Sequence, residues 1–163
     1  MSYSYDISII GGLGHVGLPL GIYFAHKGKK TLLIDKNKNN SKIVKKGLLP
    51  FKEDINGINL KKLIKSNIKV SLNLSDISKS KFIIIALGTP VNQKGIPETK
   101  PFIYIVKKII DLMNKDQILV IRSSVYPGLI DEIIKIASKK KIKNIAYCPE
   151  RISQGNSINE LKT

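Results

Sequence analysis

Residues 5–17 read YDISIIGGLGHVG, a short apolar run followed at once by closely spaced glycines. The run Tyr5–Ile10 is typical of a buried strand, and apolar residues near helical spacing follow from His15 to about Lys27. Glycines between a strand and a helix permit a tight turn in which a nucleotide diphosphate rests on backbone N–H groups at the helix start. The stretch therefore predicts the first unit of a dinucleotide-binding α/β fold.

The glycines have the spacing G-x-G-x-x-G from Gly12 to Gly17. We expect Gly12 to permit the tight turn, Gly14 to leave room for the pyrophosphate, and Gly17 to let the helix pack close to the sheet. The motif alone also fits a glycine-rich turn that arose by chance, and its place between a strand and a helix favours cofactor binding. The residues expected to bind the cofactor here are Gly12, Leu13, Gly14, His15, Val16 and Gly17.

An acidic residue follows the second predicted strand, Thr31–Ile34. A carboxylate at Asp35 can accept both ribose hydroxyls of an adenosine, and it would repel a 2′-phosphate. The position therefore favours NAD over NADP as the cofactor. The alternative is that Asp35 is a plain turn residue or the N-cap of a helix that starts at Lys36.

The rest of the chain alternates apolar runs with amphipathic stretches, which predicts parallel strands joined by helical crossovers. The fold class is therefore α/β, a Rossmann doubly wound and mostly parallel sheet with helices on both faces, in one domain over residues 1–163. Residues 153–163 show no clear pattern. The further strands expected are Ile68–Leu72, Phe82–Leu87, Ile118–Ile121 and Ile145–Tyr147, and the further helices are Asn39–Lys46, Leu60 to about Lys65, Pro101–Met113 and Leu129–Ser138.

The chain carries 28 Lys and Arg against 12 Asp and Glu, a formal net charge of +16. A nucleic-acid-binding surface is one interpretation, and compositional drift toward Lys, Ile and Asn is the other. Arg122 and Arg151 are the only arginines, so few side chains can make bidentate contacts with bases. Aromatic residues make up 6% of the chain, so few can stack on bases. The single cysteine, Cys148, and the lack of a signal-peptide pattern or long apolar run predict a cytoplasmic protein without a membrane segment.

Three predicted strands end in unusual sequences, and ligands of such sheets lie across the carboxyl ends of the strands. The sequence Leu-Gly-Thr-Pro begins at Leu87, Arg-Ser-Ser-Val-Tyr-Pro-Gly begins at Arg122, and Tyr-Cys-Pro-Glu-Arg-Ile begins at Tyr147. Together with the glycine motif, these segments resemble the N-terminal domain of the UDP-glucose/GDP-mannose dehydrogenases. The resemblance covers Tyr5 to about Leu161, and Tyr-Cys-Pro-Glu-Arg is most similar to the branch that acts on UDP-N-acetylhexosamines such as UDP-N-acetyl-mannosamine.

The resemblance implies an oxidation of a UDP-sugar C6 alcohol to a carboxylate, with two hydrides passed in turn to two NAD molecules. It implies that Ser124 provides a hydroxyl beside the nicotinamide and the reacting water, and that Glu150 orients or deprotonates this water. These two residues are the predicted catalytic groups. The cofactor-binding residues that the resemblance implies in these loops are Gly88, Thr89, Pro90, Ser123 and Ser124.

Each implied role has a structural alternative. For Ser123 and Ser124 the alternative is a cap of the next helix, and for Glu150 it is a surface salt bridge with Arg151. We expect His15 to act through its backbone, Arg122 to fill a variable strand-end position, and Cys148 to be a small packed residue.

In the resembled family a dimer-forming helix follows this domain, and then a UDP-binding domain that holds a nucleophilic cysteine. We expect both to be absent from the 163 residues, and the isolated chain to bind NAD without turning over a UDP-sugar. Two rivals stay open. One is another Rossmann dehydrogenase acting on a hydroxy acid, and the other is a stand-alone NAD-sensing or nucleic-acid-binding module.

Overall fold

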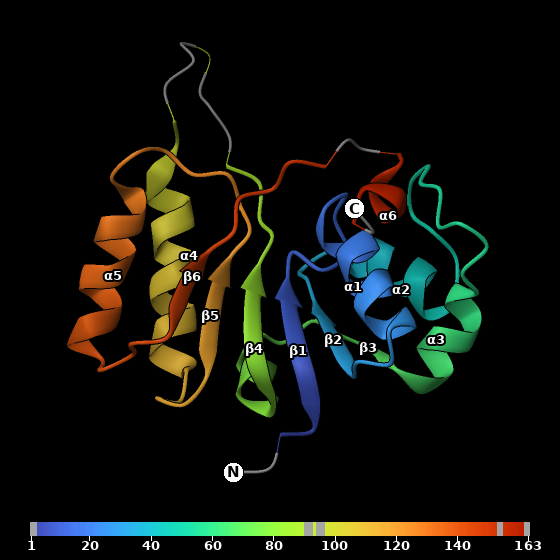
Figure 1. Cartoon of the computed structure of the whole chain (residues 1–163), viewed down its shortest axis with the longest axis horizontal. Coiled ribbons are helices and arrows are strands. Elements are labelled where there is room, and N and C mark those ends of the chain that lie inside the picture. The colour runs from blue at the N-terminus through green and yellow to red at the C-terminus, as the bar shows by residue number, and fades with distance from the viewer. Residues whose placement is uncertain (1–2, 90–92, 94–96, 153–154, 162–163) are drawn as a thin grey trace.

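The fold is a six-stranded parallel sheet with strand order β3-β2-β1-β4-β5-β6, in a computed structural model that describes residues 3–89, 93, 97–152 and 155–161. The chain starts in the middle of the sheet at β1, builds outward to β3, and crosses back to β4 before building the other half (Figure 1). This order is that of the Rossmann fold, so the predicted fold class is confirmed.

The elements follow the predicted alternation closely. The strands are β1 (Tyr5–Ile10), β2 (Thr31–Ile34), β3 (Ile68–Ser71), β4 (Ser80–Ile85), β5 (Ile118–Ile121) and β6 (Ile145–Tyr147). The helices are α1 (Gly17–His26), α2 (Lys38–Lys45), α3 (Leu60–Ser66), α4 (Thr99–Leu112), α5 (Leu129–Lys139) and α6 (Ser157–Glu160), with a 3-10 helix η1 (Leu74–Lys79). Neither η1 nor α6 was predicted, because both are short and have no strong periodicity.

Two apolar layers cover the sheet, one on each face. Successive side chains of a strand point to opposite faces, so Ile83 and Ile85 pack under α4 and α5, and Ile84 packs on the α1 side. Figure 1 shows α4 and α5 together beside one half of the sheet, and α1, α2 and α3 beside the other. Burial on both faces explains the continuous apolar runs in the sequence. Phe82 departs from this expectation, with 40% of its surface exposed.

The chain after β6 returns along the carboxyl edge of the sheet and ends in α6 beside α1 (Figure 1). Ile158 of α6 is fully buried in the apolar layer that also contains Leu18 and Ile22 of α1. The return path places residues that follow β6 near the loop between β1 and α1. Within the described part of the chain, no helix has the length and apolar character needed to cross a membrane.

Candidate functional site

The loop between β1 and α1 contains several glycines, and the structural reason for a glycine differs from one position to the next. Gly11 has a φ of +77°, a backbone conformation that favours glycine, and this requirement was not predicted. Gly12 lies in the same turn and leaves no room for a side chain, because a Cβ there would lie 2.7 Å from the Ile9 carbonyl oxygen and 2.9 Å from Leu33 Cα. At Gly17 a Cβ would lie 2.3 Å from the Gly11 oxygen, so this glycine packs against the loop rather than the sheet.

Gly14 differs from these three positions. A Cβ at Gly14 would meet only the Gly11 oxygen, at 3.4 Å, and its φ is not in the left-handed region. The packing of the protein therefore gives little reason for a glycine at this position. The space that a side chain would fill lies at the start of α1, where free backbone N–H groups and the helix dipole attract a phosphate. The loop therefore fits the diphosphate of a dinucleotide.

Asp35 follows β2 and is bound to the same loop. Its Oδ2 accepts the backbone N–H of Leu13 at 3.1 Å, and its Oδ1 accepts that of Asn37 at 3.0 Å. The N-cap of α2 is Asn37, whose side chain accepts the Asn40 N–H, so the alternative role of Asp35 as a helix cap was wrong. The Leu13 side chain is fully buried in the core, and its carbonyl oxygen accepts a bond from the Asn40 side chain at 3.2 Å, so Leu13 fixes the loop to β2 and α2.

A cavity of about 210 Å³ lies beside Asp35, which we call the adenosine-side cavity. Most of its lining is aliphatic, and Asp35 and Lys36 supply the charged groups at its edge. An apolar slot with a carboxylate at its rim suits a flat base and a ribose with two hydroxyls. The lining residues are Ile10, Gly11, Ile34, Asp35, Lys36, Leu72, Leu74, Leu87 and Ile105.

A second cavity, of about 440 Å³, has Gly14 in its wall and is called the nicotinamide-side cavity. The three loops that carry unusual sequences all contribute to its wall, and Leu87 lines both cavities. The structure thus brings most of the predicted site residues into one cleft, while Pro90 lies outside the described residues. The predicted residues in this wall are Gly14, His15, Val16, Gly88, Thr89, Ser123, Ser124 and Glu150.

The hydroxyl groups of this cavity hold its loops together. Thr89 Oγ1 donates to the Ser124 carbonyl oxygen at 2.7 Å, and Ser123 Oγ donates to that of Leu87 at 2.7 Å. Ser124 Oγ donates a long bond, 3.4 Å, to the Glu150 carbonyl oxygen, and its side chain is exposed. Neither serine caps α5, whose N-cap is Gly128, so that alternative was wrong.

Glu150 forms a bidentate ion pair with Arg122. Arg122 Nε donates to Oε2 at 2.8 Å, and Nη2 donates to Oε1 at 3.0 Å. The two side chains are 21% and 11% exposed, so the pair is partly shielded from water. The alternative of a surface salt bridge with Arg151 was wrong, because Arg151 contributes its backbone N–H to Oε1 and the ion pair is formed with Arg122.

The expectation that Arg122 only fills a variable position at the strand end was therefore wrong, because its side chain holds Glu150. A sequence signal was available, because Arg122 and Glu150 follow two successive predicted strands of a parallel sheet. In the structure these strands, β5 and β6, are neighbours with Ile121 opposite Tyr147, so the charged residues just beyond their ends are close in space. The expectation that Cys148 is packed was also wrong, because Cys148 is exposed. It follows β6, an edge strand with no further strand on its outer side.

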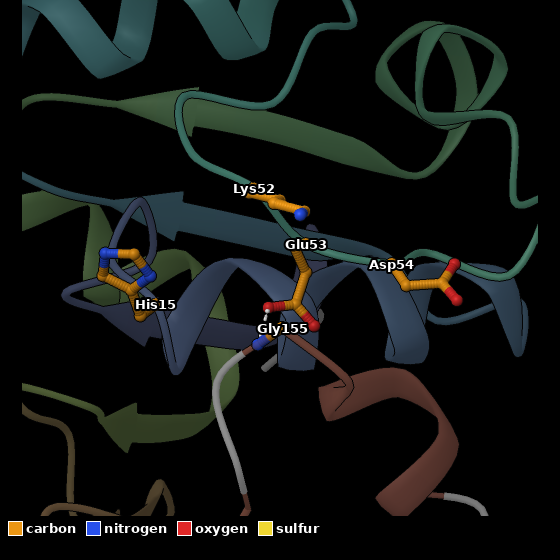
Figure 2. Close-up of a pocket in the computed structure, with 5 residues that line it drawn as sticks. All are labelled: His15, Lys52, Glu53, Asp54 and Gly155. Atoms are coloured by element: carbon orange, nitrogen blue, oxygen red, sulfur yellow. Dashed lines mark hydrogen bonds between the residues drawn. The ribbon is translucent and has the colours of Figure 1, made fainter.

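A third, open cavity of about 510 Å³ lies beside the glycine loop and is lined by His15, Lys52, Glu53, Asp54 and Gly155 (Figure 2). Glu53 is only 8% exposed, and its carboxylate accepts the N–H groups of Gly155 at 2.9 Å and Ser157 at 2.8 Å. This contact anchors the start of α6. The His15 ring stacks on Phe51, with centroids 4.0 Å apart.

Comparison with known proteins agrees with this geometry. Residues 5–163 match the model of the UDP-glucose/GDP-mannose dehydrogenase family, NAD binding domain. Protein CapL of Staphylococcus aureus is 30% identical over 97% of this chain and 38% of its own length. The UDP-N-acetyl-D-glucosamine 6-dehydrogenase of Salmonella typhi is 30% identical over 95% of this chain and 37% of its own length.

Among solved structures, the UDP-D-ManNAc dehydrogenase of Pyrococcus horikoshii superposes with a TM-score of 0.84. It is 24% identical, and the match covers 96% of this chain and 38% of that one. The chain therefore spans less than two fifths of the length of each of these relatives.

Proposed function

Because this chain belongs to the UDP-glucose/GDP-mannose dehydrogenase family, as its NAD-binding domain, we propose that it serves the oxidation of a UDP-N-acetylhexosamine to a uronate. The single observation that carries the proposal is a pair of neighbouring cavities that share Leu87. One is aliphatic with the carboxylate of Asp35 at its edge, and the other is built by three strand-end loops and by the glycine loop at Gly14. A dinucleotide has the same division, with a diphosphate between two nucleosides.

Each part of the cleft has a proposed task. The carboxylate of Asp35 accepts hydrogen bonds from the adenosine ribose, and the N–H groups around Gly14 bind the diphosphate. Gly88, Thr89 and Ser123 line the nicotinamide end, and Pro90 is assigned to it by the family resemblance alone. When bound, NAD supplies the hydride acceptor, which the protein itself lacks.

Glu150 and Ser124 are the proposed catalytic residues. The oxidation of a C6 alcohol to a carboxylate releases two hydrides and consumes one water molecule, so a group must hold that water beside the reacting carbon. The Glu150 carboxylate is an acceptor for such a water, and the exposed hydroxyl of Ser124 lies in the same cavity. Both residues come from loops that the fold brings together from β5 and β6.

The substrate class is supported by sequence likeness. The segment Tyr147–Arg151 resembles the branch of the family that oxidises UDP-N-acetylhexosamines. The Salmonella relative is named for UDP-N-acetyl-D-glucosamine, and the Pyrococcus structure for UDP-D-ManNAc. Two successive reductions of NAD per sugar belong to the same proposal.

The domain assignment extends over residues 1–163, and these residues form the cofactor side of a complete active site. The cleft has no second wall to hold a UDP group within the described residues, and Cys148 does not line it. We therefore expect a polypeptide of these 163 residues to bind NAD without oxidising a UDP-sugar.

Calorimetry of the purified chain tests the cofactor assignment. We expect NAD to bind and NADP to bind more weakly, because Asp35 repels a 2′-phosphate. A folded chain with no affinity for NAD would overturn the proposal. In the same preparation, incubation with NAD and UDP-N-acetyl-glucosamine or UDP-N-acetyl-mannosamine should give no absorbance of NADH at 340 nm, and steady NADH formation would contradict the expected inactivity.

A further inference from the structure

Arg122 has a role that the strand-end sequence did not suggest. Its guanidinium is bound to Glu150 by two hydrogen bonds, and its Nη1 lies 3.5 Å from the Cys148 carbonyl oxygen. Both Arg122 and Glu150 line the nicotinamide-side cavity. The ion pair is therefore part of the wall that a bound nicotinamide would face.

The hydrogen bonds of Glu150 are distributed unequally between its two oxygens. Oε1 accepts three bonds, from Arg122 Nη2 at 3.0 Å, from the Arg151 N–H at 2.8 Å and from the Ile152 N–H at 2.9 Å. Among the described residues, Oε2 accepts one bond, from Arg122 Nε at 2.8 Å. A carboxylate has about four acceptor positions, two on each oxygen. Oε1 is thus fully used, whereas Oε2 keeps an acceptor position.

The side chain of Arg122 is not needed to join β5 to β6. Backbone bonds already join the strand ends, from Cys148 N to the Ile121 oxygen at 2.9 Å and from Glu150 N to the Arg122 oxygen at 3.0 Å. What the guanidinium adds is the orientation of one carboxylate. Its planar fork sets both oxygens at once, which the single ammonium of a lysine does not do.

We propose that Arg122 is a positioning residue that orients the Glu150 carboxylate at the nicotinamide end of the cofactor cleft. The proposal rests on the proposed function, because that function places the nicotinamide of NAD in this cavity. Arg122 donates one bond to each oxygen, whereas both backbone N–H groups donate to Oε1, so Oε2 is the oxygen that keeps acceptor capacity. The fork of Arg122 therefore fixes the plane of the carboxylate and the direction in which Oε2 is presented to the cavity.

ADP-ribose separates the two ends of the cleft, since it contains all of NAD except the nicotinamide. The experiment measures binding of NAD and ADP-ribose to the purified chain by calorimetry, and the fluorescence of bound NADH as a signal of the nicotinamide surroundings. The variants are Arg122→Met, which removes the fork and the charge, and Arg122→Lys, which keeps the charge. Lys81→Met is the matched control, because it removes the cation from the ion pair with Asp116, which lies outside both cavities.

For Arg122→Met we expect about a fivefold loss of NAD affinity, the size of a typical coupling between contacting residues, with no change for ADP-ribose. The emission of bound NADH should also change. Arg122→Lys should behave in the same way, because the fork and not the charge orients Glu150. Lys81→Met should bind all three ligands as the parent chain does.

Two results would overturn the proposal. An equal loss of affinity for NAD and ADP-ribose would mean that Arg122 only supports the fold, and unchanged NAD binding and NADH emission would mean that it orients nothing at this end. If Arg122→Met does not fold, Arg122→Lys is judged by the same criteria. A parent chain that binds neither ligand would overturn the proposed function itself, whereas normal binding by the parent with unaltered variants contradicts the role of Arg122 alone.

Discussion

The two ends of the cleft use a carboxylate in different ways. At the adenosine end, Asp35 accepts backbone N–H groups of Leu13 and Asn37, one on each oxygen. At the nicotinamide end, Glu150 is held by the side chain of Arg122 as well as by backbone N–H groups. The first carboxylate is fixed by the course of the main chain, and the second depends on another side chain.

This difference has consequences for substitutions. At the adenosine end the geometry belongs to the backbone, so the sensitive positions are those at which a side chain would intrude or a backbone acceptor would be lost. At the nicotinamide end the geometry depends on an ion pair between two loops, so it is sensitive to the length and shape of a side chain. Changes at the two ends should therefore separate cofactor affinity, fold stability and nicotinamide contacts.

Gly14→Ala should have the largest effect on binding. The new methyl group would meet only the Gly11 oxygen, at 3.4 Å, so the fold should tolerate it. It would, however, occupy the space that we propose for the diphosphate. Overpacking of this kind costs about 2–3 kcal/mol, which corresponds to roughly a hundredfold loss of NAD affinity. Calorimetry with NAD and a thermal melt of the variant measure the two effects separately.

Gly17→Ala is the matched control for that change. Its Cβ would lie 2.3 Å from the Gly11 oxygen and 2.9 Å from Gly12 Cα, so the loop itself would have to move. We expect a loss of fold stability on the order of 3 kcal/mol. If Gly14→Ala melted as early as Gly17→Ala, the distinction between a ligand glycine and a packing glycine would be lost.

Glu53→Gln tests a third carboxylate, which anchors the segment leading to α6. The side chain is 8% exposed and accepts two backbone N–H groups, and an amide would direct its own N–H₂ toward one of them. We expect a loss of about 2 kcal/mol, as for a buried group left without its partner. Urea unfolding gives the free energy, and hydrogen exchange should rise at the amides of Gly155 and Ser157.

Asp54→Asn serves as the control for Glu53, since Asp54 is exposed and accepts one N–H, from Asn56 at 2.7 Å. Its effect on stability should be a few tenths of a kcal/mol, as for an ordinary surface substitution. Equal losses of unfolding free energy in the two variants would mean that the buried contacts of Glu53 add no more stability than the exposed contact of Asp54.

The adenosine end was the more predictable end of the cleft, because the residues of its motif lie close together in the sequence. A strand, closely spaced glycines and a carboxylate after the next strand are all visible in one stretch of residues 5–35, and β1 and β2 begin and end where they were expected. The requirement for Gly11 was not visible in the sequence, because its φ of +77° is a property of the folded backbone.

The nicotinamide end was predicted by its residues but not by its contacts. Ser124 and Glu150 were identified through a family resemblance, and the structure places both in one cavity. The partner of Glu150 was misjudged, because Arg151 is adjacent in the sequence whereas Arg122 is adjacent in the sheet. The packing of α6 depends on Ile158 and Glu53, which no local periodicity connects.

Asp35→Asn should weaken NAD and ADP-ribose binding equally, by about tenfold, because it removes a charged acceptor for ribose hydroxyls and leaves the nicotinamide end intact. Asp6→Asn is the matched control: Asp6 also accepts a backbone N–H, from Lys30 at 2.8 Å, but it lies at the other end of β1. Calorimetry with both ligands measures the effect. A loss confined to NAD would place Asp35 at the wrong end of the cleft.

Apart from the control variants, the smallest effect is expected for Asp76→Asn, and Asp76 lies in η1 beside the adenosine end. The hydrogen bond from Lys79, and then that from Ser71, lowers the pKa of Asp76 below its usual value of 3.8. The folded state therefore favours the ionised carboxylate, and this contribution is present above about pH 4 and disappears as the pH falls through the lowered pKa. Because the ion pair is largely exposed, the variant should lose only about 0.5 kcal/mol at pH 7. Urea unfolding at pH 7 and pH 3 should show the difference between parent and variant shrinking in acid, and a difference that grew in acid would mean that the folded state favours the protonated form, which contradicts the lowered pKa.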